Sequence, residues 1–511
     1  MSVDSASRTG TAPPDDLAVP AWRQVTAAVI LAATGLGAAL VLPPLVAGGL
    51  LLVVAVVILA RRILFSRLGL FGLFIAVLMI FPVRRYALPI PLPFALEPYR
   101  VLLLVLIVAV LGAVLVDSRR TWQPVGFGWP IGIFVASLVI SIPANGDDLV
   151  REGLASTAAG SLLNYALLLS LFYVTRQVIS THRLVLGLLN ALVWSSVAVA
   201  FAAVIERVTR INPFLRLHEV LPLDLIATDS ESFRAGGFRS FASSQHPIAL
   251  SVMLCILIPI AIYLMRYSPW PRHPINRRVV YGLAILIMLG GVLSAVSRTA
   301  IIVLAVMLLL TLILRPWLGI TLIAFSLPAL LAGMLFVPRI VNTMLLSFLD
   351  LDALIASQQT SPGWRGAGRL ADLGPAMDEF AENPLFGTGV GSRIVVGDDQ
   401  NAFILDNQVL GTMLETGVVG VIGLAALFVV PAIMLLRWSF TVARDDLEFA
   451  MLGFALTVSL AGFCAAMFFY DAFGFYQTLF VVFMLLAVGG WLITASPPAL
   501  RVRESRERLL A

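Results

Sequence analysis

The stretch Val101–Val116, VLLLVLIVAVLGAVLV, contains no charged or hydrogen-bonding side chain. A helix that crosses a bilayer needs about 20 mostly apolar residues, within a range of about 17–25. Runs of this kind recur along the chain, and they decide its fold class. We predict an all-α, polytopic membrane helix bundle of about 12–14 transmembrane helices. Several runs are short, so their boundaries are expected to move by a few residues.

The candidate spans cover most of the chain. They lie at about 25–41, 45–60, 68–83, 101–116, 129–143, 158–175, 184–205, 246–265, 279–296, 299–314, 317–336, 409–436, 447–469 and 474–494. The first two flank Pro43–Pro44 and could form one re-entrant hairpin, which would remove two crossings together. The later topology is the same in either case.

The composition excludes a soluble protein. The 511 residues are 60% hydrophobic and only 12% charged, whereas soluble domains have roughly 25% charged residues. A chain so poor in charge cannot cover a water-facing surface, but it can cover a lipid-facing one. The net charge is +5 and every basic residue is arginine. Most arginines lie in short segments between apolar runs, which indicates membrane topology and not nucleic-acid binding.

The two cysteines, Cys255 and Cys464, lie inside apolar runs. Their spacing fits neither a metal site nor a disulfide framework. We expect no bound metal and no cofactor.

The arginines also predict an orientation. They follow the second, fourth, sixth, eighth, tenth and twelfth spans, and they flank both termini. The positive-inside rule then makes these segments and both termini cytoplasmic. We predict a disordered cytoplasmic tail at 1–22, a bundle over 23–496 and a basic cytoplasmic tail at 497–511. Two long outer loops follow, at about 206–245 and 337–408, the second with a helix around Leu370–Glu382.

A minority of arginines fall on the outer side, against this rule. Interfacial snorkelling or acidic partners in the same loops explain most of them. Arg298 is different, because Ser297–Arg298–Thr299 stands between two apolar runs with almost no loop. A charge at that depth is costly and marks a candidate functional residue. Its planar guanidinium suits phosphate oxygens.

Four stretches carry a family resemblance. They are Glu97–Arg100 (EPYR); Arg234–Arg239 (RAGGFR) with His246–Pro247; Ser297–Ala300 (SRTA); and Arg369 with Glu382–Gly391 (ENPLFGTGVG), Asp406–Leu410 (DNQVL) and Glu415–Gly417 (ETG). In this order, over about residues 97–494, they resemble the O-antigen ligase and O-antigen polymerase superfamily of bacterial membrane glycosyltransferases. Ligases typically carry a histidine where this chain has Asp406, which favours a polymerase or another branch.

The resemblance implies an activity and a site. The activity is transfer or polymerisation of a polyprenyl-diphosphate-linked oligosaccharide onto a hydroxyl of a glycan or lipid acceptor, at the outer face of a bacterial inner membrane. Arg298 and one of Arg234 or Arg239 would bind the diphosphate, with Arg369 as a third ligand. Arginine can neutralise the leaving group. Asp406 would orient or deprotonate the acceptor.

Several alternatives stay open. Asp406 could instead cap the helix that follows it, and the glycines of Asn383–Gly391 are typical of a structural turn. The number of spans equally fits a transporter or a flippase for lipid-linked precursors. Such proteins often carry mid-membrane charges and paired broken helices, and few charges interrupt the spans here. A scaffold for envelope synthesis is a third class.

Overall fold

The computed structural model describes residues 66–90, 95–116, 121–227, 233–234, 237–345, 373–395, 400–403, 405–442 and 446–494, with scattered residues between 29 and 55. Nine helices in this part of the chain are long and apolar enough to cross a membrane: α4 (Pro98–Val116), α7 (Ala155–Val178), α8 (His182–Thr209), α9 (Pro247–Tyr267), α10 (Pro274–Ala295), α12 (Pro316–Phe336), α16 (Gln408–Val442), α17 (Leu447–Ala466) and α18 (Tyr476–Thr494). Three shorter apolar helices accompany them: α3 (Arg67–Ile80), α5 (Gly128–Ala144) and α11 (Arg298–Leu314). The protein is a polytopic all-α membrane protein, as predicted.

Short elements fill the connections. They are α6 (Gly146–Arg151), the 3₁₀ helices η1 (Pro213–Glu219) and η4 (Ala472–Gly474), α13 (Pro338–Met344) and α15 (Leu373–Glu382). Strand β1 (Tyr86–Ala87) pairs antiparallel with β2 (Asp224–Leu225), and β3 (Phe233–Arg234) pairs with β4 (Gly237–Phe238). The predicted helix around Leu370–Glu382 is therefore confirmed as α15. The two candidate spans before residue 61 lie largely outside the described residues.

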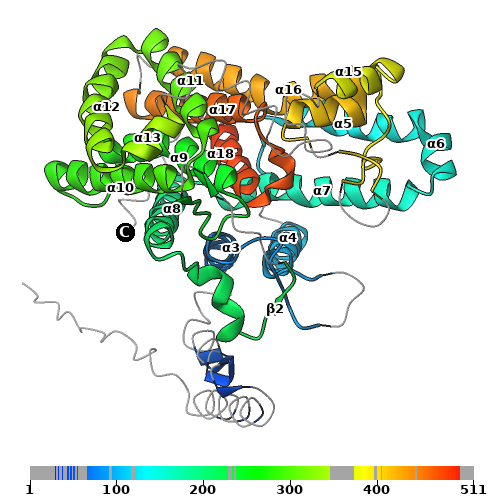
Figure 1. Cartoon of the computed structure of the whole chain (residues 1–511), viewed down its shortest axis with the longest axis horizontal. Coiled ribbons are helices and arrows are strands. Elements are labelled where there is room, and N and C mark those ends of the chain that lie inside the picture. Colours follow the sequence, from blue (N-terminus) through cyan, green and yellow to red (C-terminus); the bar gives the residue numbers. More distant parts are fainter. Residues whose placement is uncertain are drawn as a thin grey trace, which may run out of the picture.

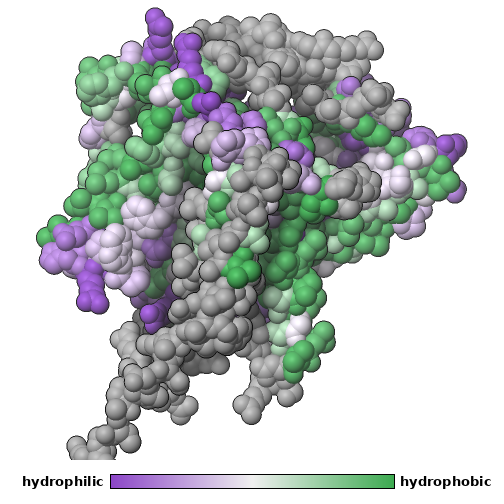
Figure 2. Space-filling model, turned by 90° about the horizontal axis from the view of Figure 1, so that it is seen from below, coloured by the Kyte–Doolittle hydropathy of each residue, from purple (hydrophilic) through white to green (hydrophobic). Residues whose placement is uncertain are grey.

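The outer surface of the bundle is apolar. On α4, Leu104, Val108 and Leu115 are 50–83% exposed, whereas Leu103, Leu106 and Val110 on the other side of the same helix are buried. Figure 2 shows apolar surface over much of the described part, with polar residues gathered at its margins. Such a surface is unfavourable in water and fits lipid chains. It explains why these helices show no polar face.

Helices α9, α17 and α18 form the enclosed centre of the bundle. Helix α9 packs against α8, α10, α11, α17 and α18. Small residues let these helices approach closely. A methyl group on Gly291 of α10 would lie 2.8 Å from Ala200 of α8 and from Leu254 of α9. Helix α15 packs against α16, and α16 packs against α5. Figure 1 shows these helices at one edge of the molecule, far from α12 at the other.

Helix α16 is broken at Gly417, where φ is 65° and ψ is −161°. The segment after α15 enters the break. Val418 N–H donates to the Pro384 carbonyl at 2.9 Å, and a Cβ on Gly417 would lie 2.3 Å from the Leu385 carbonyl. Only glycine adopts this backbone conformation easily and leaves this room. The break therefore fixes residues 383–392 against the first half of α16.

Side-chain hydrogen bonds tie the connections into two groups. At one end, which we call the loop end, the Gln477 amide donates to the Leu78 carbonyl at 3.0 Å and Ser244 Oγ donates to Gln477 at 2.5 Å. At the opposite end, Gln123 N–H donates to Gln177 at 2.9 Å. The loop end contains the junctions α3–α4, α8–α9, α10–α11 and α17–α18 and the start of α16.

Candidate functional site

Arg239 lies at the loop end, in the extended segment between β4 and α9. Its side chain is buried, and Nε donates to the Ala295 carbonyl at 3.1 Å. The neighbouring Ser240 N–H donates to the Ser294 carbonyl at 3.1 Å. These two bonds dock the α8–α9 loop onto the last turn of α10. Arg239 thus contacts Ala295, which lies three residues before Arg298 in the sequence.

Arg298 is the first residue of α11. Between the two helices, Val296 takes a left-handed conformation with φ 46°, which turns the chain within two residues. Arg298 is half-buried, and its Nε donates to the Thr343 carbonyl of α13 at 3.3 Å. The N-terminus of a helix carries partial positive charge. Two arginines beside it make this part of the loop end strongly favourable for an anion.

The structure describes the other two predicted arginines only in part or not at all. Arg234 pairs with Gly237 in the β3–β4 hairpin, five residues before Arg239. The structure describes its backbone only. Arg369 lies outside the described residues. Of the Arg234 and Arg239 alternatives, Arg239 is the one whose side chain contacts the Arg298 segment. The binding roles of all four arginines remain predictions.

The start of α16 settles what caps that helix. Asn407 is the residue before α16, and its Oδ1 accepts the N–H of Leu410 at 3.0 Å. Asn407 therefore supplies the side-chain cap at this helix start. Asp406 precedes it and is partly exposed. The geometry leaves the predicted acceptor role of Asp406 open and assigns the capping bond to its neighbour.

Gln408 fastens this segment to the α17–α18 junction. Its N–H donates to the carbonyls of Met467 at 2.8 Å and Tyr470 at 3.2 Å. Its side-chain Oε1 accepts the N–H of Phe473 at 2.7 Å. Residues on both sides of Asp471 are therefore bound to Gln408, two residues from Asp406. The two aspartates belong to one hydrogen-bonded junction.

The glycine-rich segment Asn383–Gly391 forms a structural turn, which was one of the alternatives that the sequence left open. Gly387, Gly389 and Gly391 all have positive φ, and Thr388 N–H and Gly389 N–H donate to the Leu414 and Glu415 carbonyls at 2.9 Å. The turn places the Arg393 guanidinium where it acts on the Glu415 carboxylate. Glu415 keeps some accessible surface. Arg393 Nη1 itself forms an ion pair with Glu379 of α15 at 2.5 Å, which ties the turn to that helix.

Arg84 was missed by the sequence analysis as a site residue. It has φ 62°, a conformation rare for a residue with a side chain. Its N–H donates to Glu97 at 2.5 Å, and its Nη2 donates to the Tyr476 hydroxyl at 2.7 Å. The guanidinium also lies 4.4 Å from the Tyr476 ring centroid. Asn164 Nδ2 donates to the same hydroxyl at 2.8 Å. These contacts hold an exposed cation in one place.

Glu97, the first residue of the EPYR stretch, has a structural task. It is buried at the entry to α4 and forms an ion pair with Arg100 at 3.3 Å. Burial raises the pKa of Glu97, while the Arg84 N–H and the Arg100 charge oppose that rise. Its role is to hold the strained Arg84 backbone. The signals in the sequence were the wrong-side arginine and this motif, but the partner Tyr476 lies nearly 400 positions away.

Glu206 shapes the segment that carries Arg239. Its carboxylate is buried at the end of α8, where it accepts the Ala242 N–H at 2.7 Å and the Asn212 amide at 3.2 Å. Ala242 has φ 50°. The carboxylate therefore stabilises a strained turn next to Arg239, which is a structural task.

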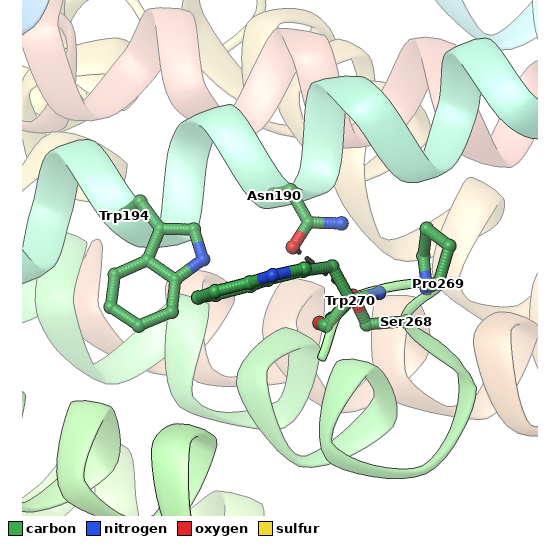
Figure 3. Close-up of a pocket in the computed structure, with 5 residues that line it drawn as sticks. All are labelled: Asn190, Trp194, Ser268, Pro269 and Trp270. Atoms are coloured by element: carbon green, nitrogen blue, oxygen red, sulfur yellow. Dashed lines mark hydrogen bonds between the residues drawn. The ribbon is translucent and has the colours of Figure 1, made fainter. Parts of the chain in front are cut away.

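A pocket of about 400 Å³ lies at the opposite end, between α8 and the end of α9. Figure 3 shows its lining of Asn190, Trp194, Ser268, Pro269 and Trp270. The Trp194 and Trp270 rings meet edge to face, with centroids 6.3 Å apart. No charged side chain lines it. Since α9 is about 30 Å long, this pocket is separate from the arginines, and its tryptophans suit a membrane interface.

The structure thus defines a class of protein: a multi-pass helical membrane protein whose loop end holds accessible carboxylates together with arginines fixed by hydrogen bonds. The family model described as O-antigen ligase matches residues 283–425. The match confirms the resemblance to the O-antigen ligase superfamily. It runs from α10 to the first part of α16 and includes Arg298, Asp406 and Glu415. A comparison with curated proteins finds no match. The match supports glycan transfer of the O-antigen ligase or polymerase kind, in general terms from a lipid-linked oligosaccharide to a glycan acceptor.

Proposed function

We propose that the loop end transfers or polymerises a glycan from a polyprenyl diphosphate onto an acceptor hydroxyl at the outer face of the inner membrane. The observation that carries this proposal is the docking of Arg239 onto Ala295, beside Arg298 at the start of α11. In the reaction the acceptor oxygen bonds to the anomeric carbon, and the bond from that carbon to the diphosphate oxygen breaks. The leaving diphosphate takes the electron pair.

Arg239 and Arg298 would stabilise the charge that develops on this diphosphate. Bidentate arginine contacts suit phosphate oxygens, and donors that are already fixed need no reorganisation during the reaction. Arg239 is fixed by its bond to Ala295, and Arg298 by its bond to Thr343. Arg234 and Arg369 are the further candidates for this role. Asp406 is the candidate for orienting the acceptor hydroxyl.

The surroundings support a lipid-linked donor. The loop end adjoins helices with exposed apolar side chains, along which a polyprenyl chain could lie while its diphosphate meets the arginines. The arginine distribution along the sequence favours the outer face for this end and the cytoplasm for both termini. Labelling of single cysteines from outside, in the loop end and at the opposite end, tests this orientation.

Deletion of the gene followed by envelope-glycan analysis tests the function. We expect shortened or unattached glycan, restored by the wild-type gene and not by Arg298→Ala or Asp406→Ala. Unchanged glycan length and attachment in the deletion strain would refute the glycan-transfer proposal. Activity of the Arg298→Ala protein would refute only the assignment of that residue.

One observation favours a second candidate, a flippase for a lipid-linked precursor. The break in α16 at Gly417, next to the charged Glu415, is a feature that transporters use. Movement of a labelled lipid-linked glycan across proteoliposomes, without transfer to an acceptor, would support this candidate over the transferase.

A further inference from the structure

We propose that Asp471, in the α17–α18 junction between Asp406 and Arg84, takes the proton from the acceptor hydroxyl. This inference rests on the proposed function and adds the acceptor half of the site. In the step, the hydroxyl proton moves to an Asp471 carboxylate oxygen while the acceptor oxygen attacks the anomeric carbon. The diphosphate leaves with the electron pair and is neutralised by the arginines.

The geometry places Asp471 between the two groups. Tyr470 and Phe473, on either side of it, are hydrogen-bonded to Gln408, two residues after Asp406. Tyr476, which begins α18, accepts the hydrogen bond from Arg84 at 2.7 Å. The junction therefore holds Asp471 between an aspartate from the start of α16 and an arginine from the α3–α4 loop.

Asp471 is accessible, yet protein surrounds it. Its side chain is exposed, and nevertheless desolvation by the surrounding protein raises the pKa of Asp471. The accessible surface of Asp471 is what lets a substrate reach its carboxylate. The nearby Arg84 charge lowers the pKa of Asp471, and the Asp406 charge raises it. A base with a raised pKa accepts a proton more readily near neutral pH.

Other groups face the same carboxylate. Charged or titratable neighbours come from α7, α16 and the junction itself: Tyr165, Glu415 and Tyr470. The ring of Tyr165 also contacts Phe473 at a centroid distance of 5.4 Å. The Tyr165 and Glu415 side chains keep accessible surface. An aromatic face and carboxylates together can bind the faces and hydroxyls of a sugar, which fits a glycan acceptor.

A purely structural role for Asp471 makes a different prediction. Its Oδ1 accepts the Gly474 N–H at 3.3 Å and so caps η4. An asparagine would accept the same hydrogen bond, because its side-chain carbonyl replaces Oδ1. Asp471→Asn therefore removes the base and preserves the cap. Asp446→Asn is the matched control, since Asp446 caps α17 at the opposite end through the N–H groups of Glu448 and Phe449.

The test is transfer by purified full-length protein from a polyprenyl-diphosphate-linked glycan, measured from pH 5 to 9. We expect Asp471→Asn to lower kcat about 100-fold or more, the usual contribution of a general base, with donor KM little changed and Asp446→Asn near wild type. In Asp406→Asn, the acid limb of the transfer that remains should lie about one pH unit lower, because removing a negative charge lowers the pKa of Asp471. Arg84→Gln should move that limb higher.

Each outcome decides the proposal. An Asp471→Asn protein with the wild-type rate and pH profile overturns it, as do unshifted acid limbs in both neighbour variants. If Asp471→Asn fails to fold, Asp471→Glu replaces it and must retain measurable transfer with a shifted acid limb. Wild-type protein that binds the donor but transfers nothing to any acceptor overturns the proposed function itself, which is a separate result.

Discussion

The two ends of the bundle use arginine in a similar way but differ in their backbone strain. At the opposite end, Arg176 Nη1 donates to the Ile179 carbonyl at 3.1 Å and Arg277 Nη1 to the Ser268 carbonyl at 2.9 Å. At the loop end, Arg239 makes a similar bond to Ala295. A bond from an arginine to a backbone carbonyl therefore does not by itself distinguish a site from an anchor. What sets Arg239 apart is that this bond places it beside Arg298, at the N-terminus of α11.

Backbone strain does distinguish the two ends. In the described part of the chain, every residue other than glycine with positive φ lies at the loop end: Arg84, Arg210, Ala242 and Val296. Each such residue costs on the order of 1–3 kcal/mol and persists only where its surroundings hold it. Glu97 holds Arg84, and Glu206 holds Ala242. The comparison teaches that one end of the bundle anchors helices, while the other stabilises strained turns that carry charged side chains.

Carboxylates follow the same division. At the opposite end, Asp446 caps α17, and Glu448 pairs with His182 at 3.3 Å. At the loop end, Glu97 and Glu206 hold strained backbone, whereas Asp406, Glu415 and Asp471 keep accessible surface. Arg393 acts on Glu415, and Arg84 acts on Asp471. Asp471 caps η4 as well, so capping alone does not separate the two ends. The accessible carboxylates are the feature that the loop end adds.

The largest effect is expected where the loop end is built, at the break in α16. Gly417→Ala should destabilise the protein by about 2–6 kcal/mol, because it combines a strained backbone with a clash against the Leu385 carbonyl. Thermal unfolding in detergent measures the loss. Gly411→Ala on the same helix is the control, since a Cβ there meets nothing within 4 Å. Equal stability of the two variants would contradict the importance of the break.

The next effect separates arginines that bind substrate from arginines that anchor helices. Arg298→Ala and Arg239→Ala should each lower the rate of glycan transfer about 100-fold, in line with the loss of one donor to a developing charge. Arg277→Ala removes comparable bonds to carbonyls at the opposite end, so it should lower stability and leave the rate per folded molecule unchanged. Similar transfer rates for all three variants would show that the arginines at the loop end do not bind substrate in a way that Arg277 does not.

The fold could be predicted because lipid imposes a simple requirement. Every span needs a long apolar run, so hydropathy alone placed α4 and α18 within a few residues. The break at Gly417 was not predicted, because the long apolar run after it reads as one span and its cause is a contact with a segment about 30 residues earlier. Local sequence does not record such packing.

The candidate site could be predicted only where a motif marks it. Arg298 stood out because its charge interrupts two apolar runs, and Asp406 because of the resemblance. Arg84 and Asp471 did not stand out, since their importance depends on the meeting of the α3–α4 and α17–α18 junctions. That meeting is set by helix packing, for which the sequence has no local signal.

The smallest effect sharpens the claim that strain at the loop end serves function. Arg210 ends α8 in the left-handed conformation with φ 60°, and its N–H donates to the Glu206 carbonyl at 2.7 Å. Its side chain is exposed. Arg210→Gly should stabilise the protein by about 1 kcal/mol, because glycine adopts this helix-ending conformation without steric cost. Thermal unfolding measures the gain, and glycan transfer should be unchanged.

Arg84→Gly gives the same backbone relief at φ 62° and is the matched comparison. It also removes the guanidinium that bonds to Tyr476 and acts on Asp471. We therefore expect transfer to fall in Arg84→Gly and not in Arg210→Gly. If both variants transfer glycan at the wild-type rate, the strain at Arg84 holds no functional side chain. The concentration of strained residues at the loop end would then reflect only the tight turns between helices.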